Sequence, residues 1–136
     1  SADYMQAWYS VAMSNPTVLF YAYTKSLTYW DNVVNEMPIL NNFVLTASYG
    51  GRADHMISEL GLRSTTVVYS EAEAEKLGLA IDHDDSHAAR PSLRNQDFAL
   101  LIHGTQPKGS DAAVALRALK GKGSYSRKKN KALAIA

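Results

Sequence analysis

Residues 17–26 read TVLFYAYTKS, residues 27–38 read LTYWDNVVNEMP and residues 41–51 read NNFVLTASYGG. The first and third segments each contain a continuous apolar run, at residues 18–23 and 43–45, and end in polar or glycine residues, whereas the second has apolar residues at helical spacing. Continuous apolar runs are typical of strands in a parallel sheet that helices cover on both faces. This stretch therefore predicts a strand, a helix and a second strand parallel to the first.

The same alternation continues along the chain. Strands are predicted at residues 17–24, 43–48, 65–69 and 98–103, and helices at residues 3–14, 27–37, 52–60, 71–77 and 111–119. Residues 81–96 form one long segment that is predicted to be irregular, and long irregular segments in compact domains are often functional. The pattern predicts an α/β domain with a mainly parallel, four-stranded sheet, arranged as a three-layer sandwich or as half of a β/α barrel.

The aromatic residues of the first strand and helix, Tyr21, Tyr23, Tyr29 and Trp30, are predicted to pack in the core. In a half barrel, the strand at residues 17–24 would present an apolar edge without a neighbouring strand. Such an edge favours pairing with another chain. A homo-oligomer formed through this edge is therefore one expectation.

Composition excludes several classes of protein. The chain has 136 residues and no cysteine, so it forms no disulfide, no thiolate zinc site and no iron–sulfur cluster from its own residues. No apolar run approaches the roughly 20 residues that span a bilayer, so no membrane association is expected. The sequence has no initiator Met, so we expect it to be a processed chain, a trimmed chain or a fragment.

The net charge of +1 hides an uneven distribution, because all 13 acidic residues lie at or before Asp111. We predict an α/β domain at residues 1–120 and a basic, flexible tail at residues 121–136. Such a tail is a solvated arm, docks on an acidic surface of its own chain or of a partner, or contacts nucleic acid phosphates. Its basic residues, together with the last one of the domain, are Lys120, Lys122, Arg127, Lys128, Lys129 and Lys131.

Polar residues follow the predicted strands, and in a parallel sheet the carboxyl ends of the strands share one edge, where α/β proteins bind ligands. The alternative is that strands simply turn at polar residues. Lys25 could neutralise a phosphate or carboxylate, and His103 could act as a general base or a metal ligand, so both are candidate catalytic residues. The candidate ligand-binding residues are Ser26, Ser48, Tyr49, Gly50, Gly51 and Thr105. The two glycines could present backbone N–H groups to an anion, or form an ordinary tight turn.

The densest polar cluster is IDHDDSHA at residues 81–88. His83, Asp85 and His87 could bind a divalent metal ion, although their spacing matches no known metal motif. The alternatives are a solvated acidic loop, or carboxylates that orient the histidines by hydrogen bonding.

Six segments in this order resemble the bacteriophage gene product 88 domain family: FYAYTKS, NNFVLTASYGG, VVYSEAEAEKLGL, IDHDDSHA, FALLIHGTQPKGS and LKGKGSY. The resemblance covers about residues 4–125, and it implies an α/β fold in a phage protein of a bacterial host, for which the cytoplasm is the default compartment. Longer relatives carry an upstream segment with cysteines that is reminiscent of radical S-adenosylmethionine enzymes, but this chain has no cysteine to bind such a cluster. The resemblance also suggests one pocket faced by Lys25, Ser48, His83, Asp85, His87 and His103.

Two functions fit these features. The first is an enzyme-derived α/β domain that binds a small anionic or nucleotide-like ligand at the carboxyl ends of its strands. Lys25 would hold the anion, His103 would transfer protons, and residues 82–87 would close over the site or hold a metal. The alternative is a non-catalytic binding or assembly module whose basic tail engages nucleic acid or an acidic partner. Whether the chain is an enzyme is left open.

Overall fold

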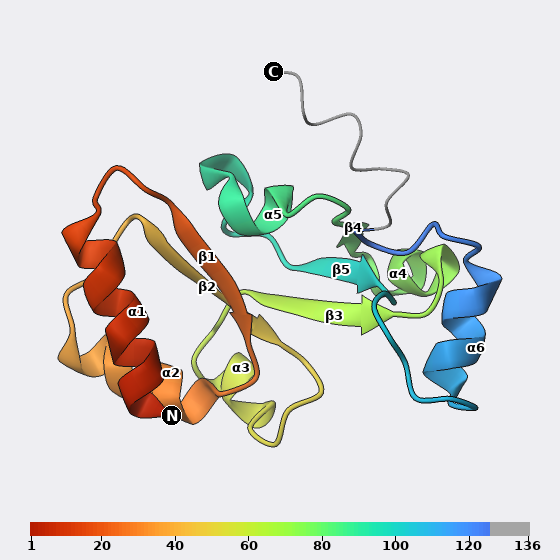
Figure 1. Cartoon of the computed structure of the whole chain (residues 1–136), viewed down its shortest axis with the longest axis horizontal. Helices are drawn as coiled ribbons and strands as arrows, with labels where there is room; N and C mark the ends of the chain where they lie inside the picture. The colour runs from red at the N-terminus through yellow and green to blue at the C-terminus, as the bar shows by residue number, and fades with distance from the viewer. Residues whose placement is uncertain (126–136) are drawn as a thin grey trace. The chain divides into compact units, whose positions relative to one another are not determined.

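The computed structural model describes residues 1–125 (Figure 1). The chain forms two compact units. Unit 1 comprises Ser1–Ser64 and Ala88–Gln96, and unit 2 comprises Thr65–His87 and the chain from Asp97 onward. None of the helices in residues 1–125 combines the length and the apolar character that crossing a bilayer requires.

Unit 1 contains the strand–helix–strand stretch that the sequence predicts. Its elements are α1 (Ala2–Ser14), β1 (Phe20–Thr24), α2 (Leu27–Glu36), β2 (Phe43–Ser48), α3 (His55–Glu59) and the short 3₁₀ helix η1 (Pro91–Leu93). β1 and β2 are parallel, with Phe20 opposite Phe43 and Thr24 opposite Ala47. The core of the unit is a cluster of Leu27, Ala47 and Ile57, against which Trp30 packs.

Asn42 fixes the position of α1 beside the first strand. Its side-chain amide donates to the carbonyl oxygens of Ala12 at 2.9 Å, Asn15 at 3.0 Å and Val18 at 2.9 Å. One side chain at the start of β2 therefore joins the end of α1 to the segment that leads into β1. α1 also packs against α2 (Figure 1).

Unit 2 contains β3 (Ser64–Val68) except for its first residue, α4 (Glu71–Leu77), β4 (Ala80–Ile81), β5 (Phe98–Leu101) and α6 (Asp111–Ala118), and α5 (Ser86–Ala89) begins in it. β5 pairs in parallel with β3 on one side and with β4 on the other. Val68, Ala74, Ala99 and Leu101 form its core, with Leu79, Ile81 and Leu119 packed against them.

Ser70 caps the N-terminus of α4. The Ser70 hydroxyl accepts from the Glu73 N–H at 3.2 Å, and the Glu73 carboxylate accepts from the Tyr69 N–H at 2.7 Å. Gly78 ends the helix in the left-handed conformation, with a φ of 69°, which costs glycine little.

The predicted α/β class with parallel strands is confirmed, but the predicted number of four strands is one short, because the structure has five. The additional strand is β4, and the segment that was predicted to be irregular at residues 81–96 also contains α5 and η1. β4 has only two residues, which is too short to show a periodic pattern. The choice between a sandwich and a half barrel stays a prediction.

The prediction that the first strand is buried on both faces is wrong. β1 begins at Phe20 and not at residue 17, and Tyr21 in its middle is 40% exposed. Among the described residues, β1 pairs with β2 alone, so it is a terminal strand. The placement of Tyr21 and Tyr29 in the core is wrong for the same reason, since both line an open cavity on unit 1.

Candidate functional site

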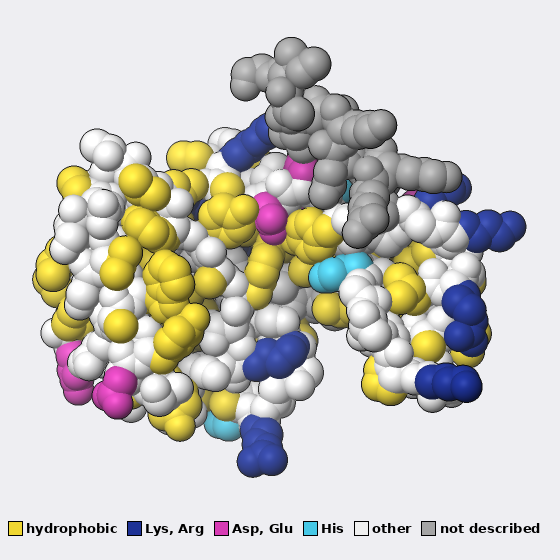
Figure 2. Space-filling view, viewed as in Figure 1, with side chains coloured by type: hydrophobic (Ala, Val, Ile, Leu, Met, Phe, Trp, Pro, Cys, Tyr) yellow, Lys and Arg dark blue, Asp and Glu magenta, His cyan; other side chains and the backbone are white. Residues whose placement is uncertain are grey.

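A cavity of about 630 Å³ lies in unit 1, between α1, β1 and the start of α2. This volume is within the range of about 300–1,000 Å³ that is usual for small-molecule sites. The aromatic residues that line it are Tyr4, Trp8, Phe20, Tyr21, Tyr23, Tyr29 and Phe43. Hydrophobic side chains gather on the part of unit 1 that α1 and β1 form (Figure 2).

The cavity follows from the spacing of aromatic residues on α1. Tyr4 and Trp8 are four residues apart, so they lie on one face of the helix, and their rings meet edge to face at 6.3 Å. Trp8 also contacts Phe20 of β1, with ring centroids 6.4 Å apart. Tyr9, the residue after Trp8, lies on a neighbouring face of the helix and is buried against Phe43. α1 therefore packs on the strands through Tyr9, and the rings of Tyr4 and Trp8 line the cavity.

The lining of the cavity is uncharged in its side chains. Among the described residues, no Lys, Arg, His, Asp or Glu lines it, and its polar side chains are hydroxyls of tyrosine, serine and threonine. Thr24 and Ser26, at the carboxyl end of β1, are two of these. Such a surface suits a planar ring that stacks on aromatic faces and accepts or donates a few hydrogen bonds.

Lys25 points away from this lining and joins the ends of β1 and β2. Its ammonium donates to the Ser48 hydroxyl at 2.9 Å, to the Ser48 carbonyl at 3.3 Å and to the Tyr49 carbonyl. An ammonium group has three N–H donors, and each of the three has an oxygen acceptor here. The predicted neighbourhood of Lys25, Ser48 and Tyr49 is therefore present as a hydrogen-bonded cluster.

In the turn after β2, the carboxylate of Asp54 binds two backbone amides. The Asp54 carboxylate accepts from the Gly50 N–H and from the Gly51 N–H, both at 2.8 Å. The hydrogen bond from Gly50 is the largest cause of the lowered pKa of Asp54; desolvation opposes it, and the Gly51 bond and the charge of Lys25 add to the lowering. The two amides that were predicted to bind an external anion thus hold a carboxylate of the chain itself. An Asp three to four residues after a glycine pair is a signal from which this contact could have been predicted.

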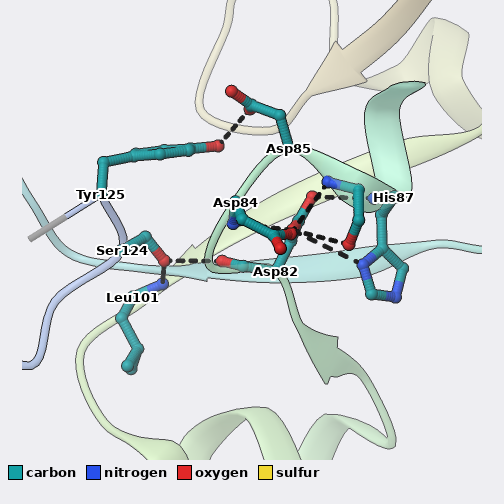
Figure 3. Close-up of polar contacts among 8 residues, drawn as sticks. Asp82, Asp84, Asp85, His87, Leu101, Ser124 and Tyr125 are labelled. Atoms are coloured by element: carbon teal, nitrogen blue, oxygen red, sulfur yellow. Dashed lines mark hydrogen bonds and ion pairs between the residues drawn. The ribbon is translucent and has the colours of Figure 1, made fainter. Parts of the chain in front are cut away.

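In unit 2, Asp82 organises the loop that holds the predicted metal ligands (Figure 3). Its carboxylate is buried and accepts from the His87 N–H at 3.0 Å, the Asp84 N–H at 3.2 Å and the Ser86 hydroxyl at 3.4 Å. The His87 ring stacks on Phe98 at 5.2 Å, and its Nδ1 lies 3.7 Å from the Asp82 carboxylate. The 3.7 Å separation is longer than a hydrogen bond, so the alternative in which a carboxylate orients a histidine ring by hydrogen bonding stays a prediction.

Metal binding by this loop gains no support from the geometry. Within residues 1–125, no group of three or more His, Cys, Asp or Glu side chains is arranged to hold a metal ion. His83 and Asp85 are half-buried in the same loop as His87. A metal held by His83, Asp85 and His87 therefore stays a prediction.

His103 and Thr105 follow β5 in unit 2. The His103 Nδ1 lies 3.0 Å from the Leu101 carbonyl oxygen, and the ring meets Tyr125 edge to face at 4.8 Å. Thr105 is exposed. Since Lys25 and Ser48 belong to unit 1, the single pocket that they were predicted to share with His103 also stays a prediction.

A family model described as gene product 88 matches residues 1–127 of the chain. The chain belongs to the gene product 88 family. No curated protein and no solved structure matches it. Membership confirms the resemblance that the sequence motifs indicate, whereas the relation of longer relatives to radical S-adenosylmethionine enzymes is not tested by it.

The tail of this gene product 88 protein lies mostly outside the described residues. Arg127, Lys128, Lys129 and Lys131 are among residues 126–136, which the structure does not describe. Binding of nucleic acid or of an acidic partner by the tail, and the homo-oligomer through the edge of β1, stay predictions. Residues 121–125 of the predicted tail are described and belong to unit 2, where the Ser124 N–H donates to the Leu101 carbonyl.

Sequence reasoning missed the aromatic cavity and the role of Asp82. The cavity is formed by residues from α1 and β1 that are far apart in the sequence, and each of them alone is typical of a core residue. Tyr4 and Trp8 at a spacing of four, ahead of a strand rich in tyrosine, were the available signal.

Proposed function

We propose that unit 1 of this gene product 88 protein binds a small, planar, nucleotide-like ligand in the cavity beside β1. The observation that carries this proposal is the cavity of about 630 Å³ with an aromatic and hydroxyl lining, which reaches Thr24 and Ser26 at the carboxyl end of a strand. The ring of the ligand would stack on the aromatic side chains. Stacking of a base on an aromatic side chain contributes about 1–3 kcal/mol.

The charges around the cavity indicate which part of the ligand carries the affinity. Among the described residues no basic side chain lines the cavity, and Lys25 donates to oxygens of Ser48 and Tyr49. A phosphate would have to compete with these oxygens for the ammonium group. We therefore expect a nucleoside to retain most of the affinity of the corresponding nucleotide.

Tryptophan fluorescence can test the proposal, because the chain has two tryptophans and only Trp8 lines the cavity. The W30F variant leaves Trp8 as the single reporter, and it can be titrated with nucleosides and nucleoside monophosphates. We expect saturable quenching that the further substitution Tyr23→Ala weakens. The substitution Tyr69→Ala, at an exposed tyrosine in unit 2, is the matched control and should leave the titration unchanged.

The proposal fails if no nucleoside or nucleotide quenches Trp8 at concentrations up to about 1 mM, where binding would be weaker than about −4 kcal/mol. It also fails if Tyr69→Ala weakens the quenching as much as Tyr23→Ala does.

A further inference from the structure

Residues 123–125 complete the end of β5 in unit 2. The Ser124 side chain is 1% exposed, and its hydroxyl accepts from the Leu101 N–H at 2.8 Å and donates to the Asp82 carbonyl at 2.8 Å (Figure 3). The Ser124 N–H donates to the Leu101 carbonyl at 3.3 Å. Ser124 thus forms hydrogen bonds with both the N–H and the carbonyl of Leu101, as a residue of a neighbouring strand would.

The residue before Ser124 must be a glycine for this contact to form. A Cβ atom on Gly123 would lie 2.4 Å from the Ile102 carbonyl oxygen, which is closer than any real contact of this kind. The close approach of the two backbones is therefore built into the sequence, and the segment is not a chance contact of a basic tail.

Tyr125 extends the segment to a carboxylate and a histidine. Its hydroxyl donates to the Asp85 carboxylate at 2.7 Å (Figure 3), and its ring lies edge to face with His103 at 4.8 Å. Tyr125 and Asp85 both have a positive φ, 60° and 63°, which is costly for residues other than glycine. Such conformations persist where the surrounding contacts hold them, and they cluster at functional sites.

The hydrogen bond of His103 determines which of its nitrogens can act as a base. A carbonyl oxygen only accepts, so the contact between Nδ1 and the Leu101 oxygen requires the proton on Nδ1. In the neutral ring the lone pair then lies on Nε2, which is the atom that can take a proton from a ligand or coordinate a cation. Among the described residues, Nε2 forms no hydrogen bond.

We infer that residues 123–125 preorganise His103 as a proton-accepting site in unit 2. Leu101 fixes the tautomer, and Tyr125, itself held by Asp85, fixes the orientation of the ring. Tyr125 and Asp85 are positioning residues in this arrangement, and the Nε2 atom of His103 is the reactive group. This inference concerns unit 2 and is independent of the ligand proposed for unit 1.

Nitrogen-15 NMR of the histidine rings in the full chain tests this inference, with His103→Gln used to assign the signals among the four histidines. We expect the neutral ring of His103 to show a protonated Nδ1 and an unprotonated Nε2. Tyr125→Ala should remove this pattern, together with the ring-current shift that Tyr125 causes. His55, which lies in unit 1, is the internal reference and should keep its signals.

Two variants separate positioning from a general loss of structure. Asp85→Ala removes the acceptor of the Tyr125 hydroxyl, whereas Asp85→Asn keeps a side-chain oxygen that can accept the bond. We expect Asp85→Ala to lose the His103 pattern and Asp85→Asn to restore it, with the backbone amide spectrum of α6 unchanged in both. A proton on Nε2 of His103 in the unaltered chain would overturn the inference, and so would a tautomer that Tyr125→Ala leaves unchanged.

Discussion

The substitution Ser124→Ala removes two buried hydrogen bonds while changing only one atom. The Leu101 N–H and the Asp82 carbonyl both lose their contact with the serine hydroxyl, at 2.8 Å each in the structure. An unsatisfied buried polar group costs about 1–3 kcal/mol. Because the carbonyl can regain part of its bonding from a water molecule, we expect the free energy of unfolding to fall by about 2–4 kcal/mol.

Urea unfolding followed by circular dichroism measures this loss. Fluorescence is less suitable, because both tryptophans lie in unit 1 and Ser124 lies in unit 2. With a denaturant dependence of about 2 kcal/mol per molar urea, the midpoint should fall by roughly 1–2 M. The control is Ser10→Ala, at an exposed serine inside α1 whose hydroxyl donates to the Gln6 carbonyl, and it should change the stability by less than about 0.5 kcal/mol.

The two variants together decide whether residues 123–125 belong to the folded unit. If Ser124→Ala is as stable as Ser10→Ala, the hydroxyl does not hold the end of β5. The close contact of residues 123–125 with unit 2 would then contribute nothing to the folded state, and the reasoning from these hydrogen bonds would be refuted.

Three further substitutions test separate contacts. Tyr9→Phe should raise the free energy of unfolding by about 1 kcal/mol in urea titrations, because the buried Tyr9 hydroxyl has no hydrogen-bond partner among the described residues; a loss of stability would show that it has one. Asp54→Asn should destabilise the chain at neutral pH. The folded-state pKa of Asp54 is lowered, so its contribution is present above the unfolded pKa of about 4 and is lost as the pH falls through the folded value. Melting curves of the two proteins should therefore converge at acidic pH, and a constant gap would contradict the assignment. Lys25→Met should lower the stability by about 1 kcal/mol, since three oxygens lose their donor at a partly exposed site; an unchanged melting temperature would show that water replaces the ammonium fully.

The alternation of elements was predictable because it depends on long segments with a clear period. Residues 43–48 and 71–77 have the same bounds in the structure as in the prediction. Proline and glycine marked most helix ends, as at Gly78. The class of fold therefore follows from local patterns, while β4 could not be found, because two residues carry no period.

The sites were only partly predictable because they depend on contacts between distant segments. The polar residues at the ends of β1 and β2 were predicted to meet, and Lys25 does bond Ser48. Lys25 and the Gly50 amide donate hydrogen bonds to oxygens of the chain itself. These bonds depend on the geometry of the turn, which the sequence does not show. Likewise, Ser124 and Tyr125 stand in a basic segment whose composition is typical of a tail, and only their contacts show that they are part of unit 2.

The aromatic cavity illustrates why an apolar strand is not always a core strand. An apolar run indicates burial, but it does not say whether the covering surface is the same chain or a ligand. In β1 the run belongs to a terminal strand, and Tyr21 and Tyr23 line a space that α1 only partly closes.

Calorimetric titration of adenosine into the full chain and into the Ala22→Phe variant tests most directly whether this cavity binds a planar ligand. Ala22 lines the cavity on the exposed side of β1, so a phenylalanine there fills the space without disturbing the core. We predict measurable heat of binding for the unaltered chain and none for Ala22→Phe, with equal melting temperatures for the two proteins. Equal binding by both, or by neither, would contradict the account.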